Sequence, residues 1–312
     1  MNREHAWRPE TAPPWSSILG PTGWTRLLTV AVLIGWIYWD QLLRMVRIWQ
    51  SHLDWSHGFL ILPFSLYLLH TRRAEFIDVK PRPSWLGMPI VLAGLFIYAA
   101  AIRWKIGYPQ PLSMLVVLVG AVVWLAGWSV LRRMLFPIAF LALAMPPPER
   151  LYRVVTQPLQ QLAAFVSEIL LAAIPNIIVL RNGIHLVAMD TQQNTQASFT
   201  VAGACSGMRS LLAFTALGLA MAFITPRPTW HRITMAIIVL PVALFCNSLR
   251  VVATGLLMVY DWADFAKGTP HSLLGIMTFA LGLTMYSLIL YILDHLFVET
   301  EESDGSRASE AS

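Results

Sequence analysis

Long apolar segments constrain the fold of this chain more than any other feature. They lie at about 27–46, 57–71, 85–102, 112–129, 133–145, 208–225, 233–258 and 272–296. A helix needs roughly 20 consecutive apolar residues to cross a bilayer. Of the 312 residues, 56% are hydrophobic and only 12% are charged, whereas a soluble domain has about 25% charged residues. The sequence therefore predicts an all-α polytopic membrane protein with about eight transmembrane helices.

The two ends of the chain differ in composition from its middle. Residues 1–25 are polar and contain prolines, and they show no apolar core or small-residue cleavage site of a removable signal. Residues 299–312 are acidic and serine-rich, which predicts a disordered tail. Between them, 26–298 is predicted to form one integral membrane domain, with both ends of the chain in the cytoplasm.

Basic residues in the short loops predict how the chain is oriented. Loops that face the cytoplasm carry more Lys and Arg than loops on the other side. The connections assigned to the cytoplasm contain the following residues: Arg72, Arg73, Lys80, Arg82, Arg132, Arg133, Arg227 and Arg232. This choice places the whole stretch 146–204 outside.

Two segments within this outer stretch differ from the apolar runs. Polar residues interrupt 151–175, so this segment is expected either to lie in the membrane interface or to form an unusual span. The β-prone runs 177–180 and 184–187 flank Asn182-Gly183, which is a strong hairpin signal. We expect a small extracytoplasmic β-hairpin here.

The net charge of +5 arises from cations scattered between apolar runs. A nucleic-acid surface would gather them on one face, so no nucleic-acid partner is expected. The 13 Trp residues fit anchors at the headgroup level of a lipid bilayer. No histidine spacing typical of metal sites occurs, and neither a metal nor another cofactor is expected.

Cys205 is the first candidate for chemistry, because it lies where a loop meets a long apolar helix. A helix N-terminus and a nearby cation both lower the pKa of a thiol, and Arg209 lies one turn further. Gly203 and Gly207 would leave room for a peptide backbone. Two other interpretations remain open, namely a buried structural thiol and a disulfide with Cys246.

Two further polar residues are predicted to lie near the depth of Cys205. Arg250 lies about 27 Å of helix rise beyond Arg232, and its guanidinium is suited to stabilise an oxyanion. Asn247 lies three residues earlier and is placed to orient it. His271 opens the last apolar run and is able to deprotonate a thiol and then protonate a leaving amine. Each residue alone also fits an ordinary solvated or interfacial side chain.

Several motifs resemble those of the exosortase/archaeosortase family. They are Ala204-Cys205-Ser206-Gly207-Met208-Arg209-Ser210, Asn247-Ser248-Leu249-Arg250, His271-Ser272-Leu273-Leu274-Gly275, Trp55-Ser56-His57-Gly58-Phe59 and Met145-Pro146-Pro147-Pro148-Glu149. The resemblance covers about residues 45–295. It differs at Gly203, where many members of the family have Glu.

The resemblance implies a membrane-embedded cysteine transpeptidase or protease that cleaves C-terminal sorting signals of the PEP-CTERM type. It maps the catalytic roles onto Cys205, Arg250 and His271. Supporting roles are expected for Arg209, Asn247, Ser206 and His57. It further implies a multi-pass protein of the bacterial inner membrane with its active site facing the periplasm. Its partners would be substrate proteins that carry the signal, together with exopolysaccharide-assembly proteins.

Two alternatives assign other roles to the same residues. In the first, the chain is a non-enzymatic membrane component of exopolysaccharide export, and Cys205, Arg250 and His271 are structural. In the second, it is an anion transporter in which Arg209 and Arg250 bind the anion at a broken helix, and Pro241 favours this interpretation.

Overall fold

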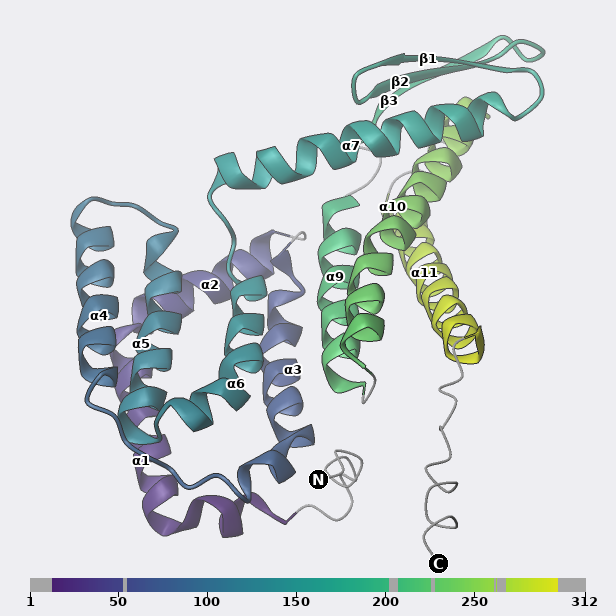
Figure 1. Cartoon of the computed structure of the whole chain (residues 1–312). Helices are drawn as coiled ribbons and strands as arrows, with labels where there is room; N and C mark the ends of the chain where they lie inside the picture. Colours follow the sequence, from purple (N-terminus) through teal and green to yellow (C-terminus); the bar gives the residue numbers. More distant parts are fainter. Residues whose placement is uncertain are drawn as a thin grey trace, which may run out of the picture.

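A computed structural model describes residues 13–52, 55–201, 207–225, 228–260, 262 and 268–296, with the backbone alone at 207–211, 268–272, 294 and 296. The elements in chain order are α1 (Trp15–Ile37), α2 (Trp39–Ser51), α3 (Gly58–Thr71), η4 (Arg73–Phe76), α4 (Gly87–Arg103), α5 (Pro109–Leu125), α6 (Trp128–Phe140), η5 (Leu141–Ala144), α7 (Glu149–Ala172), β1 (Ile177–Asn182), β2 (His185–Asp190), β3 (Thr195–Thr200), α9 (Gly207–Ile224), α10 (Thr229–Val259) and α11 (Gly268–Leu296). Figure 1 shows α1–α6 as one group of helices and α9–α11 as a second group, with α7 and the sheet above them.

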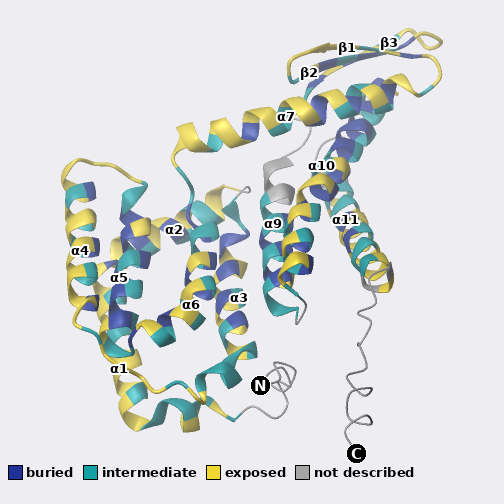
Figure 2. Cartoon of the chain, viewed as in Figure 1, coloured by how far each residue is buried: buried dark blue, intermediate teal, exposed yellow. Residues whose placement is uncertain are grey.

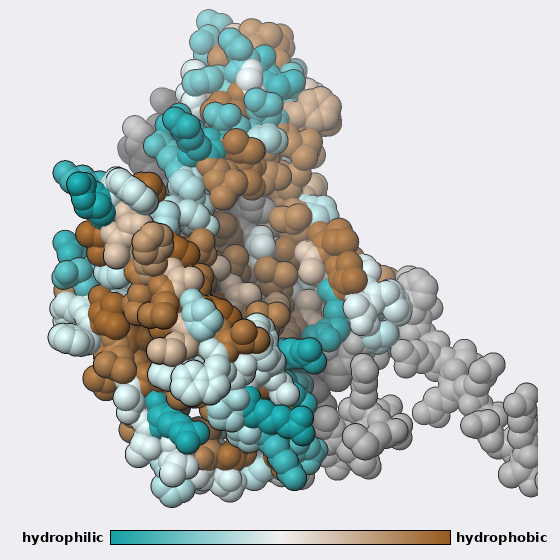
Figure 3. All heavy atoms as spheres, turned by 60° about the vertical axis from the view of Figure 1, so that its left-hand side comes forward, coloured by the Kyte–Doolittle hydropathy of each residue, from teal (hydrophilic) through white to brown (hydrophobic). Residues whose placement is uncertain are grey.

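The described helices fit a membrane protein, although not each one is long enough to span. Among the described residues, four helices are long and apolar enough to cross a membrane, namely those at Trp15–Ile37, Glu149–Ala172, Thr229–Val259 and Leu273–Leu293. Four shorter apolar helices accompany them. In Figure 3, hydrophobic residues cover much of the middle of the visible face, and hydrophilic residues gather toward its two ends. The chain is therefore a helical, multi-pass membrane protein, and the predicted number of about eight spans stays a prediction.

The first predicted span, at about 27–46, does not form one continuous helix in the structure. Helix α1 begins at Trp15, earlier than the apolar run, and a break at Tyr38 separates it from α2. The ring of Tyr38 is fully buried, and its hydroxyl lies 3.1 Å from that of Ser113 in α5. The single run at 27–46 thus supplies parts of two helices.

The predicted hairpin is present and belongs to a larger sheet. β1 pairs with β2 in antiparallel register, and Asn182 lies opposite His185 across the turn. Gly183 has a φ of 62°, a conformation that glycine adopts without strain. The sequence analysis missed β3, which pairs with β2 on its other side and makes the sheet three-stranded.

Helix α7 lies across the helices of the second group. Figure 1 shows it running nearly at right angles to α9, below the sheet. It crosses α10 at two small residues, where the Ser167 hydroxyl donates to the Ser248 carbonyl at 3.3 Å and the Ser248 hydroxyl to the Ala163 carbonyl at 3.5 Å. One buried cluster joins α7, the sheet and the last turns of α10, and it includes Leu171, Leu186 and Val251.

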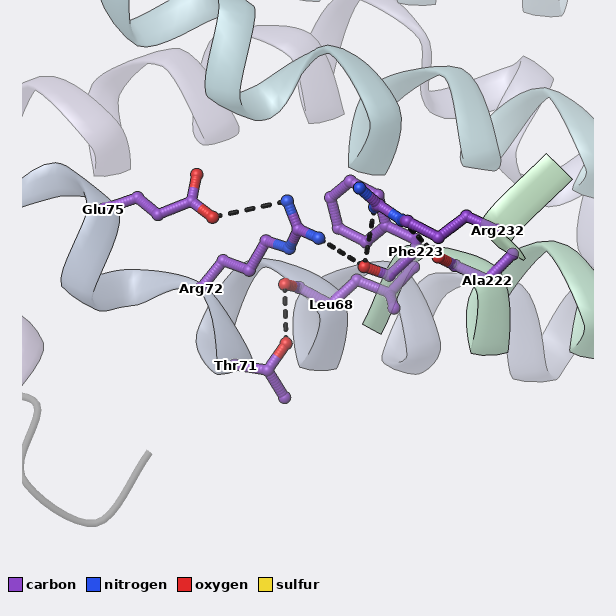
Figure 4. Close-up of polar contacts among 7 residues, drawn as sticks. All are labelled: Leu68, Thr71, Arg72, Glu75, Ala222, Phe223 and Arg232. Atoms are coloured by element: carbon purple, nitrogen blue, oxygen red, sulfur yellow. Dashed lines mark hydrogen bonds and ion pairs between the residues drawn. The ribbon is translucent and has the colours of Figure 1, made fainter. Parts of the chain in front are cut away.

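The two helix groups meet at the end of the molecule where α1 begins and α11 ends, called the lower end as in Figure 1. Figure 4 shows Arg72, which follows α3, donating to the Phe223 carbonyl in the last turn of α9. Arg232 of α10 donates to the same carbonyl at 3.0 Å and to the Ala222 carbonyl at 2.7 Å. Glu75 forms an ion pair with Arg72 at 3.3 Å. We call Arg72, Glu75, Phe223 and Arg232 the lower arginine cluster.

Candidate active site

Arg250 is a buried cation near the upper end of α10, with an exposed fraction of 6%. Its guanidinium lies against Gly275 of α11. A Cβ atom built at Gly275 would lie 3.2 Å from Nη2 and 3.3 Å from Cζ of Arg250. The missing side chain at Gly275 therefore makes the space that the guanidinium fills. Gly275 follows His271 by four residues, so the two lie one turn apart on one side of α11.

The start of α9 lies at the level of Arg250. Helices α9 and α10 pack in opposite directions, with Gly218 directly against the Val239 side chain and Phe214 in a cluster with Ala243. Eleven residues before Gly218 is Gly207, and eleven residues after Val239 is Arg250. Because α-helices rise equally per residue, this register sets the first residue of α9 level with Arg250.

Helices α9 and α11 run in the same direction, and their packing gives the same level. The Phe214 and Phe279 rings stack with centroids 4.6 Å apart, and a Cβ atom at Gly282 would lie 2.3 Å from Phe214 Cζ. Seven residues before Phe214 is Gly207, and seven residues before 279–282 is 272–275. The start of α9, Arg250 and the second turn of α11 therefore lie at one level in the molecule.

The predicted site residues are described to different extents. Arg250 and Asn247 lie one turn apart on α10. Arg209 lies in the first turn of α9 and His271 in the first turn of α11, where the structure describes the backbone. Cys205 and Ser206 lie outside the described residues. The structure thus brings together the helices that carry or follow these residues, and direct contacts among the catalytic candidates stay a prediction.

His57 belongs to the first helix group, at the beginning of α3 (Figure 1). It precedes α3, is 7% exposed, and its Nε2 lies 3.2 Å from the Leu143 carbonyl. The Trp49 indole lies against Gly58 and donates to the Ala144 carbonyl at 2.9 Å. These contacts hold η5, which leads toward α7, in place. They assign a structural role to the His57 motif, and a direct role in chemistry stays a prediction.

Sequence reasoning missed two residues that shape the surroundings of Arg250. Gly275 was named only as the last residue of the His271 motif, and its contact with the guanidinium needs the packing of α10 on α11. Phe199 of β3 packs its ring on Gly255, where a Cβ atom would lie 2.4 Å from Phe199 Cζ. This contact fixes the sheet to α10 just beyond Arg250. The alternation of buried Ala197 and Phe199 with exposed neighbours was the available signal for a strand.

Helix N-termini and a guanidinium both contribute positive potential at the level of Arg250. A helix N-terminus carries about half a positive charge on its unpaired N–H groups. Helix α9 begins at this level, and α11 begins only a few residues before it. The Arg250 guanidinium at the same level is a further hydrogen-bond donor. Within the described part of the chain, no group of three or more His, Cys, Asp or Glu residues suits a metal ion.

The comparisons with known proteins place this arrangement in a family. No curated protein and no solved structure gives a significant match to the chain. One family model, described as transmembrane exosortase (Exosortase_EpsH), matches residues 49–288. This range is well over half of the chain and contains α3–α10, the sheet and most of α11. The chain belongs to the transmembrane exosortase family.

Proposed function

We propose that this protein is a membrane cysteine transpeptidase or protease that cleaves a C-terminal sorting signal of exported proteins, with Cys205 as nucleophile, Arg250 as oxyanion donor and His271 as general acid and base. Membership of the exosortase family supports a transpeptidase-like role. The observation that carries the residue assignment is the buried guanidinium against Gly275, one turn from His271 and level with the start of α9. Cys205 precedes that start by two residues.

The positive potential at this level supports the first step. A nearby guanidinium and helix N-termini stabilise a thiolate relative to the thiol. The Cys205 thiolate attacks the scissile carbonyl carbon, and the carbonyl oxygen takes up the negative charge. Arg250 donates hydrogen bonds to that oxyanion, which is the kind of contact that strengthens in the transition state.

Collapse of the tetrahedral intermediate breaks the C–N bond. The leaving amine takes a proton from His271, and the acyl group remains on sulfur as a thioester. Water or an acceptor amine then attacks the thioester carbonyl and gives its proton to His271. The free thiolate returns, so atoms and charge balance over the cycle. Water gives a hydrolysed product, and an amine of a surface glycan or lipid gives a transferred one.

The position of the site near one end of the bundle supports a substrate that is itself held in the membrane. We propose that the substrate holds a single C-terminal anchor helix in the bilayer and presents its motif at the outer interface. Lateral entry would bring the scissile bond to the level of Arg250. In this proposal the protein lies in the bacterial inner membrane with the site facing the periplasm. Arg209 and Asn247 support the charge of the site, and exopolysaccharide-assembly proteins are further partners.

The decisive experiment is processing of a tagged sorting-signal substrate by Cys205→Ala, compared with Cys246→Ala. Cys246 is the matched control, because it is a buried thiol within α10 that packs near Gly282. We expect Cys205→Ala to abolish cleavage and Cys246→Ala to retain it, with both proteins present in the membrane at equal amounts. Unchanged processing by Cys205→Ala would remove the enzyme assignment. Equal loss in both variants would indicate a structural role for the thiols.

A further inference from the structure

Helix α7 carries an apolar stripe that no other described element covers. The side chains of Leu151, Val154, Val155, Leu162, Phe165 and Ile169 are exposed by 44–69%. At about 100° per residue these positions fall on one side of the helix. The buried positions Thr156, Ala163, Ala164, Ser167 and Leu171 lie on the opposite side, against α10 and the sheet. Figure 2 shows the exposed residues continuing along α7.

Two contacts fix how α7 is turned about its axis. On one flank, Leu159 and Tyr152 pack against the cluster of Phe214 and Ala243 in the helix bundle. On the other flank, Glu168 pairs with Arg181 of β1 in the sheet. The first flank therefore faces the bundle and the second faces the sheet. The apolar stripe lies between these flanks and points away from α10.

The level at which α7 crosses α10 matches a membrane boundary. Ser248, at the crossing, lies 19 residues after Thr229, which corresponds to about 28 Å of helix. The hydrocarbon core of a bilayer is about 30 Å thick. A helix that lies flat at this height, with an apolar stripe between a bundle-facing flank and a polar flank, has the features of an interfacial amphipathic helix.

We propose that α7 lies in the plane of the outer leaflet and that its apolar stripe binds the lipid surface, with the stripe among the upper acyl chains. The polar flank supports this assignment, because Arg150, Gln157, Gln161 and Glu168 lie together on the side that faces the sheet. Length and hydropathy alone would also allow α7 to span the membrane. Its crossing with α10 and its position across α9 favour the in-plane arrangement. The proposal is independent of the catalytic assignment.

Lipid-depth quenching tests the proposal on the full chain. In a Cys205→Ser, Cys246→Ser background, a fluorescent label is attached through Val155→Cys or Leu162→Cys on the stripe. Gln157→Cys and Gln161→Cys are the controls, since they are exposed neighbours on the polar flank. The proteins are reconstituted in phosphatidylethanolamine and phosphatidylglycerol vesicles that contain lipids spin-labelled near the headgroup or near the chain end.

We expect the headgroup-proximal quencher to act on the stripe labels about threefold more strongly than on the flank labels, with weak quenching by the chain-end lipid. Stripe labels that respond mainly to the chain-end quencher would show a spanning helix and overturn the proposal. Equal quenching of stripe and flank labels by aqueous iodide would also overturn it. As a label-free check, Leu162→Glu should lower the unfolding temperature in vesicles more than Gln161→Glu, and equal shifts would contradict the proposal.

Discussion

The two ends of α9 use arginines in opposite electrostatic settings. At its last turn, Arg72 and Arg232 donate to carbonyls at the negative end of the helix, and Glu75 adds a carboxylate. At the level of its first residue, Arg250 lies near helix ends that are themselves positive. The lower setting stabilises a cation in the folded protein. In the upper setting the helix N-termini contribute positive potential beside the guanidinium, and under the proposed function this potential would stabilise an oxyanion.

The pKa of Arg72 shows what burial costs even in the favourable setting. Burial lowers the pKa of its guanidinium, the Glu75 carboxylate raises it, and the charge of Arg232 lowers it. The group still keeps its proton throughout the physiological range, because a guanidinium is a very weak acid. The lower arginine cluster therefore joins α3, α9 and α10 at all physiological pH values.

The largest expected difference between the two settings is in catalysis. We expect Arg250→Gln to lower turnover of a tagged substrate by about 100-fold or more, since the loss of one oxyanion donor costs roughly that much. Arg72→Gln should leave turnover per folded molecule nearly unchanged. The measurement is a single-turnover cleavage assay normalised to folded protein in membranes. Equal losses in both variants would contradict the division into a catalytic and a structural arginine.

Substitution of Gly275 tests whether turnover depends on the position of the Arg250 guanidinium. A methyl group at this position would push the guanidinium by a few tenths of an ångström. We expect Gly275→Ala to reduce turnover about tenfold, because catalysis is sensitive to small displacements of a positioned group. The smaller head of a lysine leaves room for the methyl group. Gly275→Ala should therefore cost little in an Arg250→Lys background.

A double-mutant cycle separates this positioning role from a general packing defect. If Gly275 acts through Arg250, the two substitutions are strongly non-additive in their effect on turnover. Gly282→Ala is the matched control, because a methyl group there meets Phe214 and Cys246 instead. It should lower stability without this coupling. Additive effects of Gly275→Ala and Arg250→Lys would remove the positioning role.

The sequence predicted local features, such as helices and the hairpin, better than it predicted the contacts between helices. Hydropathy located the helices, and the turn chemistry of Asn182-Gly183 located the hairpin. The polar residues in apolar runs singled out Arg250. Two other contacts depend on which helices pack together. They are the packing of the Arg250 guanidinium on Gly275 and the hydrogen bonds from Arg72 and Arg232 to the Phe223 carbonyl. That information is non-local, and local sequence patterns do not contain it.

Helix α7 and strand β3 show the same limit. The polar interruptions of 151–175 left a span and an interfacial helix as alternatives, because amphipathicity does not specify an orientation. The crossing at Ser167 and Ser248 favours the second alternative. β3 was missed although the polar residues on its exposed face, such as Gln196 and Ser198, alternate with residues on the face that packs on α10. Its pairing with β2 depends on tertiary contacts and not on the local sequence alone.

Stability should respond most at the lower end. We expect Arg72→Gln to reduce the free energy of unfolding by about 2 kcal/mol, because Glu75 and the Phe223 carbonyl lose a charged donor. Thermal unfolding in detergent measures the loss. In a Glu75→Gln background the same substitution should cost less, by about 1 kcal/mol. An undiminished cost there would show that the ion pair contributes nothing and that the carbonyl contact dominates.

The smallest expected effect on stability concerns the Phe223 ring, which lies near both Arg72 and Arg232. The Arg72 Cζ lies 3.9 Å from the centroid of the Phe223 ring, and the Arg232 Cζ lies 5.9 Å from it. Phe223 also stacks on Phe136 at 4.0 Å. Phe223→Leu removes the ring face but keeps an apolar side chain and the carbonyl that both arginines bind. We expect a loss of about 1 kcal/mol, the size of a partly buried cation–π contact.

Phe136→Leu is the control for the ring at 223, since it removes the stacking partner and leaves the ring beneath the guanidinium. We expect Phe223→Leu to lower the free energy of unfolding more in wild type than in an Arg72→Gln background, while Phe136→Leu lowers it equally in both. That result would show that the cation–π contact contributes to the lower arginine cluster. The converse result would assign the lower cluster to carbonyl capping alone. Substrate turnover per folded molecule should be unchanged in both variants, because the arginines at this end hold helices together while Arg250 at the other end is the proposed oxyanion donor.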